Sequence, residues 1–183
     1  TWIYLMRYKS EAYTNLMHFF ALIQNQFNTM IKIIHTDNGQ EFLTHKFQSY
    51  LHDHGIIHER TCVETQQQNG IVERKHRHLL NIAHSLRFQA HLPLKFWDEC
   101  ILTAAYLINR TPSRNFQNKS PFEFLSNIMP NYDHLRVFGC LCSAQTLRVS
   151  RDKFSSCAST CIFLSYPSNH KAYKLYNLDT QTI

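Results

Sequence analysis

The segment IKIIHTDNGQEF, residues 31–42, determines how the rest of the chain is interpreted. Its first five residues are apolar and β-branched enough to predict a buried strand, which delivers Asp37 at its C-terminal end. Asn38 and Gly39 are a turn signal, and a helical pattern begins after them. The sequence therefore predicts a carboxylate at the end of a strand.

A second carboxylate follows in the segment QNGIVERK, residues 68–75, which predicts a loop that opens into a long helix. Glu73 lies in the first turns of that helix, with 35 residues between it and Asp37. Carboxylates at the end of a strand and at the start of a helix can meet at one point. There they would supply the oxygen ligands that a pair of magnesium ions needs for phosphoryl transfer, with a third carboxylate nearby.

A simpler interpretation of the same residues stays open. Asp-Asn-Gly after a strand is a common turn, and a Glu in a first helical turn often only complements the helix dipole. Glu41 is interpreted as a charge at a helix start rather than as a ligand.

The residues around Glu73 favour contact with nucleic acid. Amide side chains at 66–69 precede a basic run at 74–78, and such cations neutralise phosphates without reading sequence. The alternative is a solvated helix face.

Composition limits the class of protein. The chain has 183 residues, 44% of them hydrophobic, with only four glycines and five prolines, which excludes a disordered linker. A net charge of +6 favours an anionic partner such as nucleic acid. No apolar run approaches the roughly 18 residues that a membrane span needs, so no membrane partner is expected.

The six cysteines are scattered, which suits a reducing compartment and free thiols. Four of them, Cys140, Cys142, Cys157 and Cys161, could form a zinc site. Small buried thiols are the preferred interpretation, and no zinc is predicted.

Periodicity predicts an α/β order for the first part of the chain. The expected elements are a central strand at 1–8, a helix from Ser10, the strand at 31–35, a helix between an N-cap at Thr44 and a stop at Gly55, a strand at 56–58, a helix at 69–89 and another after Leu92-Pro93. The expected buried stripes of the last two helices are Val72, Leu79, Ala83 and Leu86, then Trp97, Ile101, Ala104, Ala105 and Ile108.

The composition shifts at 111–113. We expect a core domain at 1–112, a linker at 113–134 and a small β module at 135–183. Ser120-Pro121-Phe122-Glu123 has the spacing of a capping box, so the linker contains a short helix. Strands of the module are expected at 136–143, 160–164 and 172–178.

Five ordered motifs resemble one family. HTDNGQEF (35–42), QQNGIVERK (67–75), NRTP (109–112), HLRVFGC (134–140) and CIFL (161–164) resemble the integrase region of copia-type LTR retrotransposon Pol polyproteins. The resemblance implies an RNase H-like fold, a mixed sheet flanked by helices, with the retroviral-type D,D-35-E triad. Asp37 would be its second acid and Glu73 its third, and residues from about 135 resemble the start of the SH3-like module.

The resemblance also implies an activity. The complete protein would join 3′-ends of the element's DNA to target DNA with Mg2+ or Mn2+ as cofactor. Asn69, His76 and Arg77 would lie near the DNA end. The resemblance further implies a homo-oligomer in the complete integrase and a nuclear location, after a cytoplasmic particle.

The sequence departs from the family in four places. The first catalytic aspartate of the family would lie upstream of Thr1, so we expect an N-terminally truncated piece that is inactive alone, and the N-terminal zinc-binding element has no counterpart. Gln66 stands where proline is usual, and Ser165 where glycine is usual. Two alternatives remain: a degenerate or domesticated remnant that only binds nucleic acid or protein, and a stand-alone RNase H-type nuclease.

Overall fold

The computed structural model describes residues 1–61, 70–146, 154, 156–167 and 172–183. The chain divides into two compact units. One unit contains Tyr4–Lys75, and the other contains Thr1–Ile3 with His76–Ile183. Each unit has its own hydrophobic core.

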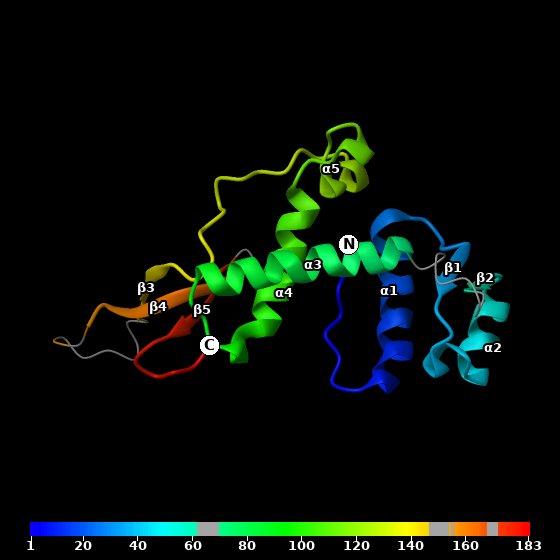
Figure 1. Ribbon diagram of the computed structural model, residues 1–183, viewed down its shortest axis with the longest axis horizontal. Helices are drawn as coiled ribbons and strands as arrows, with labels where there is room; N and C mark the ends of the chain where they lie inside the picture. Colours follow the sequence, from blue (N-terminus) through cyan, green and yellow to red (C-terminus); the bar gives the residue numbers. More distant parts are fainter. Residues whose placement is uncertain (62–69, 147–153, 155, 168–171) are drawn as a thin grey trace. The chain divides into compact units, whose positions relative to one another are not determined.

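The unit Tyr4–Lys75 contains a parallel pair of strands with two helices (Figure 1). Its elements are α1 (Ala12–Phe27), β1 (Ile33–Thr36), α2 (His45–Asp53) and β2 (Ile57–Arg60), with 3-10 turns at Lys9–Glu11 and Gln40–Phe42. The strands pair from Ile33↔Ile57 to Thr36↔Arg60. The buried core is three side chains, Phe20, Phe47 and Leu51, so this unit is held largely by aromatic packing.

The predicted ends of the second helix are confirmed. The Thr44 hydroxyl accepts a hydrogen bond from the Phe47 amide at 3.4 Å, which satisfies one of the free N–H groups of α2. After α2, Gly55 has φ +63°, a conformation that residues with a side chain adopt only with strain. The chain then turns directly into β2.

Two strand predictions in this region need correction. The predicted central strand at 1–8 is wrong, because these residues pair with no strand in the described part of the chain and Trp2, Met6 and Tyr8 are exposed. The strand that precedes Asp37 exists, but it is not buried. Ile33 and His35 face solvent while Ile34 and Thr36 are half-buried, as expected of a strand covered on one face.

The other unit contains three α-helices and a three-stranded antiparallel sheet (Figure 1). Its elements are α3 (Gly70–Gln89, whose first turns belong to the other unit), α4 (Trp97–Arg110), α5 (Pro121–Ser126), β3 (Leu141–Gln145), β4 (Ala158–Ser165) and β5 (Lys174–Asn177). The sheet order is β3-β4-β5. The three predicted strands of the module are confirmed with shifted ends, and so is the cap of α5, where Ser120 Oγ accepts from the Glu123 amide at 3.0 Å.

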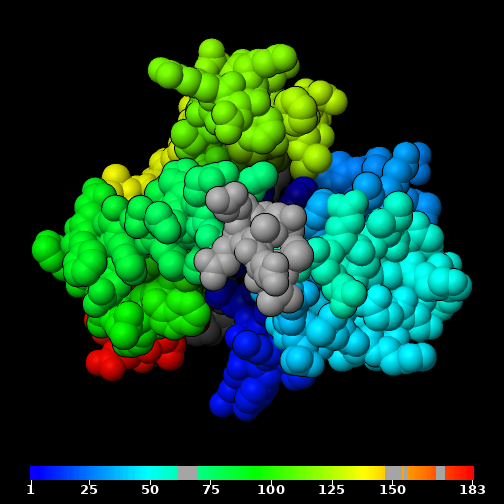
Figure 2. Space-filling model, turned by 45° about the vertical axis from the view of Figure 1, so that its right-hand side comes forward, coloured from blue at the N-terminus to red at the C-terminus, as the bar shows by residue number. Residues whose placement is uncertain are grey.

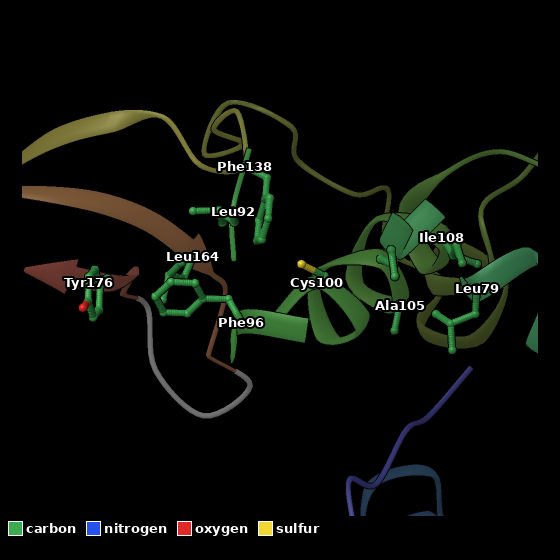
Figure 3. Close-up of a cluster of buried hydrophobic side chains, with 11 residues drawn as sticks. Leu79, Leu92, Phe96, Cys100, Ala105, Ile108, Phe138, Leu164 and Tyr176 are labelled. Atoms are coloured by element: carbon green, nitrogen blue, oxygen red, sulfur yellow. The ribbon is translucent and has the colours of Figure 1, made fainter. Parts of the chain in front are cut away.

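The core of this unit lies between α3, α4 and the sheet (Figure 3). Leu79 from α3 packs toward Ala105 and Ile108 of α4, while Leu164 and Tyr176 from the strands meet Phe96 at the start of α4 (Figure 3). The ring of Phe96 contacts that of Tyr176 edge-on at 4.9 Å. The core is therefore continuous from the long helix to the sheet.

Polar residues on one side of α4 hold the sheet. The buried Glu99 carboxylate accepts a hydrogen bond from Ser165 Oγ at 2.6 Å and pairs with the ammonium group of Lys174 on β5. One turn later, Thr103 Oγ1 donates to the Leu164 carbonyl at 3.0 Å. That carbonyl is available because the pairing of β4 with β5 shifts register between Phe163 and Ser165.

The segment just before β3 packs against the end of α3 through a glycine. Gly139 has φ +78°, and a β-carbon added to it would lie 2.3 Å from the β-carbon of Ala90. Only glycine allows this approach.

The predicted core stripes are right in part. Leu79, Ala83, Ala104, Ala105 and Ile108 are buried, but Val72 is 67% exposed and Trp97 is 49% exposed. Both wrong predictions fall in the first turn of a helix. The apolar pattern of α4 missed three buried positions, Glu99, Cys100 and Thr103. Glu99 neutralises Lys174 instead of facing solvent.

Candidate functional site

Asp37 lies at the end of β1, as predicted, and its side chain is exposed. Its Oδ1 accepts a hydrogen bond from the Gly39 amide at 3.1 Å. This contact within the turn holds the carboxylate beside the main chain and leaves its other oxygen open to solvent. We name residues 36–41 the Asp37 turn.

A second carboxylate shares the Asp37 turn. A β-carbon added to Gly39 would lie 3.0 Å from Asp37 Oδ1 and 2.9 Å from Glu41 Cδ, so both acids border the space that a side chain would fill. The 3-10 turn Gln40–Phe42 brings Glu41 back toward Asp37. The sequence pattern predicts Glu41 only as a charge at a helix start. The signal for the shared turn is the glycine between two acids, which lets a short turn bring them together.

Asn38 anchors the segment that leads to the second predicted acid. Its side-chain nitrogen donates to the Thr61 carbonyl at 2.9 Å, and the Thr61 amide donates to the Thr36 carbonyl at 3.2 Å. The end of β2 is thereby fixed to the Asp37 turn. The Asp-Asn-Gly motif, which the sequence predicts only as a turn, therefore also holds the end of β2, from which the chain continues to Glu73.

Glu73 lies in the first turn of α3 and is exposed. A carboxylate there is stabilised by the positive end of the helix dipole. His76 and Arg77 follow three and four residues later on the same helix, and both are exposed. Side chains at these spacings lie on one face, so Glu73, His76 and Arg77 are brought together. Asn69, the remaining predicted contact, lies outside the described residues.

The convergence of Asp37 with Glu73 stays a prediction. The segment 62–69 between β2 and α3 is not among the described residues. Within the residues that are described, no group of three or more His, Cys, Asp or Glu side chains could hold a metal ion.

The exposed surface of α3 is strongly basic. No acidic residue occurs between Arg74 and Asp98, while Arg74 and Arg77 are exposed cations and Lys75 and Arg87 are half-buried ones. Figure 2 shows this segment, coloured teal to green, at the molecular surface. The helix after Glu73 can therefore accept a polyanion without a local carboxylate to repel it.

The cysteines of the described residues are free thiols. Cys142 lies opposite Cys161 in the β3–β4 ladder, and burial raises the pKa of the Cys142 thiol above its ordinary value. A raised pKa keeps the group as a thiol, which suits packing. Cys62 lies outside the described residues.

Where the structure describes the chain, it contains no helix that is both long enough and apolar enough to cross a membrane.

Comparison with known sequences gives one consistent group of relatives. The family described as "Retroviral polymerase SH3-like domain" matches residues 140–183. The chain is 36% identical over all 183 residues to the "Retrovirus-related Pol polyprotein from transposon RE1" of Arabidopsis thaliana, of which it covers 12%. It is 34% identical over 176 residues, 96% of its length, to the corresponding polyprotein from transposon TNT 1-94 of Nicotiana tabacum, of which it covers 13%. The chain thus spans about an eighth of these relatives.

Comparison with solved structures finds a related architecture. A chain of the simian T-cell lymphotropic virus intasome, solved in complex with PP2A regulatory subunit B56 gamma, superposes with a TM-score of 0.53. The match covers 92% of this chain and 62% of that one at 17% identity. The HTLV-2 integrase catalytic core domain in complex with magnesium matches 61% of this chain and 68% of its own, with a TM-score of 0.45 and 22% identity.

Proposed function

We propose that this chain carries two of the metal-binding carboxylates and part of the DNA-binding surface of a strand transferase. The premise is that the chain belongs to the integrase region of the Pol polyproteins of copia-type retrotransposons. The chain has the mixed α/β fold of integrase cores, followed by a small three-stranded antiparallel module within the retroviral SH3-like region. Both were expected from the motifs. The activity is proposed, because the relatives are about eight times longer.

The proposed acids are Asp37 and Glu73. The observation that carries the proposal is the Asp37 turn, where a strand ends on an exposed carboxylate that its own main chain holds in place. Glu73 supports it with an exposed carboxylate at the start of a helix, where negative charge is favourable. The hydrogen bond from Asn38 to Thr61 holds the chain at the Asp37 turn, at the point from which it continues toward Glu73.

The donor set fits a hard divalent cation. Asp37, Glu41 and Glu73 offer carboxylate oxygens, which magnesium and manganese prefer over nitrogen or sulfur. Asp37 and Glu73 are the proposed ligands, and Glu41 adds negative charge beside Asp37. When bound, the metal would stabilise charge at the reacting phosphate and lower the pKa of the attacking 3′-hydroxyl.

The proposed DNA contacts are Asn69, His76 and Arg77. Arg77 would neutralise a phosphate near the reacting end, and His76 and Asn69 would donate hydrogen bonds beside it. The reaction needs little covalent chemistry from the protein, so these residues act by holding the two DNA partners in line.

The assembly is also a proposal. We propose the functional division into 1–112, 113–134 and 135–183, DNA ends and target DNA as partners, a homo-oligomer in the complete integrase, and action in the nucleus after a cytoplasmic particle. The basic face of α3 supports the DNA partner.

Metal binding is tested on the chain itself with manganese alone as the paramagnetic probe. Resonances of the Asp37 turn and of the first turn of α3 should broaden together, and Asp37→Asn and Glu73→Gln should each abolish the broadening at both places. Broadening at only one place would contradict a shared site. Glu59→Gln, an exposed acid on β2, is the control.

DNA binding is tested by fluorescence anisotropy against salt with a double-stranded oligonucleotide. Arg77→Ala should weaken binding and reduce the salt slope by about 1, because one phosphate contact is lost. Arg114→Ala, which removes an exposed cation outside α3, should leave the slope unchanged. Equal effects of the two variants would contradict a defined DNA face on α3.

Activity is tested in the complete integrase that contains this region. Asp37→Asn and Glu73→Gln should each reduce strand transfer about a thousandfold or more while DNA binding persists. The 183 residues alone, with two of the three expected acids, should give no product with magnesium or manganese. DNA binding without any activity in the complete protein would instead favour a domesticated binding module.

A further inference from the structure

The half-buried side chain of His58 forms two hydrogen bonds within the unit Tyr4–Lys75. On β2, its Nδ1 lies 2.9 Å from Gln48 Nε2, and its Nε2 lies 2.8 Å from Thr36 Oγ1. The ring also meets Phe47 edge-on, with centroids 5.5 Å apart. Phe47 is fully buried, so the plane of the imidazole is fixed by packing as well as by its two partners.

The direction of each hydrogen bond follows from Gln48. Its Nε2 lies 2.8 Å from the Phe42 carbonyl, which only accepts, so the group there is the amide NH2. The same nitrogen faces His58 Nδ1, which must therefore accept. Neutral histidine then carries its proton on Nε2 and donates to Thr36. The Thr36 hydroxyl, having accepted, donates to the Asp37 carbonyl at 2.8 Å.

These bonds form one relay from α2 to the proposed metal ligand. The relay runs from Gln48 through His58 and Thr36 to the main-chain carbonyl of Asp37, and no step in it lacks a donor or an acceptor. Fixing that carbonyl fixes the peptide plane after Asp37. That plane ends at the Asn38 amide, and the Asn38 side chain is itself held by the Thr61 carbonyl. With both sides of Asn38 restrained, the next amide, that of Gly39, is held where it donates to the Asp37 carboxylate at 3.1 Å.

We propose that His58 is a positioning residue, which as the neutral Nε2–H tautomer orients the Asp37 carboxylate through Thr36. The proposal rests on the proposed function for its purpose, since Asp37 is there a metal ligand. Burial, with a smaller contribution from the charge of Arg60, lowers the pKa of His58 below its ordinary value, which favours the neutral ring that the relay requires. A protonated ring would set Nδ1–H against the Gln48 NH2 and break the relay at its first bond.

The tautomer is tested on the intact chain by the nitrogen chemical shifts of the His58 ring. We expect the protonated nitrogen to be Nε2. A ring protonated on Nδ1, or one that averages between tautomers, would overturn the proposal.

The effect on Asp37 is tested through the Gly39 amide, whose hydrogen reports the position of the carboxylate without any need for activity. Thr36→Val and His58→Leu should speed exchange of this hydrogen with water by about fivefold, since a net hydrogen bond contributes about 1 kcal/mol. Thr36→Ser keeps the hydroxyl, and His58→Gln keeps a donor toward Thr36. Both should retain the original rate.

The same four variants are compared for manganese affinity. Thr36→Val and His58→Leu should bind manganese more weakly, and the two conservative variants should recover most of the affinity. If His58→Leu fails to fold, Thr36→Val decides, because valine has the shape of threonine. Unchanged Gly39 exchange in folded Thr36→Val would refute the positioning role.

The two proposals fail separately. If Asp37→Asn leaves manganese binding unchanged, the proposed function is wrong, whereas the Gly39 measurement still decides whether the relay orients the carboxylate.

Discussion

Glu99 and Asp37 are both carboxylates near the end of a β-strand, yet their environments are opposite. Glu99 is 1% exposed and is neutralised by Lys174, with Ser165 as a second donor. Asp37 is exposed and accepts one hydrogen bond, from the Gly39 amide two residues away. A carboxylate whose oxygens are satisfied by its own chain stabilises the fold. An exposed carboxylate that accepts only one such hydrogen bond is available to a ligand.

The surroundings differ in the same way. Glu99 lies in a core of eleven buried side chains that joins α3, α4 and the sheet. The core of the unit that carries Asp37 has three, Phe20, Phe47 and Leu51. The Asp37 turn is thus supported less by apolar burial than by the hydrogen bonds that Thr36, Asn38 and the Gly39 amide donate. Substitutions near Glu99 should change stability, and those near Asp37 should change binding.

The largest effect is expected from Glu99→Ala, which leaves Lys174 without its partner and opens a cavity in the core. We expect a loss of about 2–3 kcal/mol in the free energy of unfolding, below the full cost of breaking a buried pair because Lys174 is partly exposed. Chemical denaturation measures it. Glu59→Ala, which breaks an exposed pair with His35, should cost less than about 0.5 kcal/mol. Equal losses would remove the distinction between the two environments.

Thr103→Val should have the next largest effect. It leaves the Leu164 carbonyl without its buried donor at the irregular point of β4, which should cost about 1 kcal/mol. The matched control is Thr111→Val, whose hydroxyl bonds the Leu107 carbonyl at an exposed position and should matter less. If Thr103→Val leaves the free energy of unfolding unchanged, the contact of α4 with β4 is stabilised by apolar packing and not by this hydrogen bond.

Two glycines sharpen the contrast. An added methyl group at Gly39 would displace only the ends of the Asp37 and Glu41 side chains, so Gly39→Ala should weaken manganese binding about tenfold with little change in stability. Gly55→Ala meets no atom within 4 Å but is strained at φ +63°, so it should cost about 1 kcal/mol and leave binding intact. Denaturation and manganese titration of both variants provide the test, and the reverse pattern would contradict it.

The smallest effect is a pH dependence of stability. The pKa of His58 is lowered in the folded state, so the unfolded chain takes up a proton first as the pH falls. The stability contributed by neutral His58 is present above its ordinary value of about 6.5, declines as the pH falls below it, and levels off under the folded-state pKa. His58→Gln should flatten this slope between pH 7 and pH 5, relative to the original chain. Identical slopes would show that His58 does not contribute.

Much of the fold follows from local patterns in the sequence. Thr44, Gly55 and the Ser120 cap act within a few residues of themselves, and the structure confirms each. The predicted strand at 1–8 and the buried side of Trp97 are wrong because exposure depends on what packs against a segment, and periodicity contains no information about that partner.

In the candidate site, too, the residues defined by local sequence could be predicted, and those that depend on the fold could not. Asp37 and Glu73 could be named from a motif, since a strand end and a helix start are local features. The role of Glu41 depends on how one turn folds back. The relay through His58 depends on β1, α2 and β2 together, and residues 36, 48 and 58 have no spacing that marks them as partners.

Ser165, which stands where the resemblance to the family leads us to expect glycine, has a hydrogen-bond partner in the structure. Its hydroxyl donates to Glu99, so the serine is useful only in a chain that already has the acid at position 99. Losing Glu99 first would leave the buried Ser165 hydroxyl and the Lys174 ammonium group without their partner, whereas losing Ser165 first removes one hydrogen bond. The order in which a lineage can acquire or lose these residues is therefore constrained, and positions 99, 165 and 174 are expected to change together among descendants of the element.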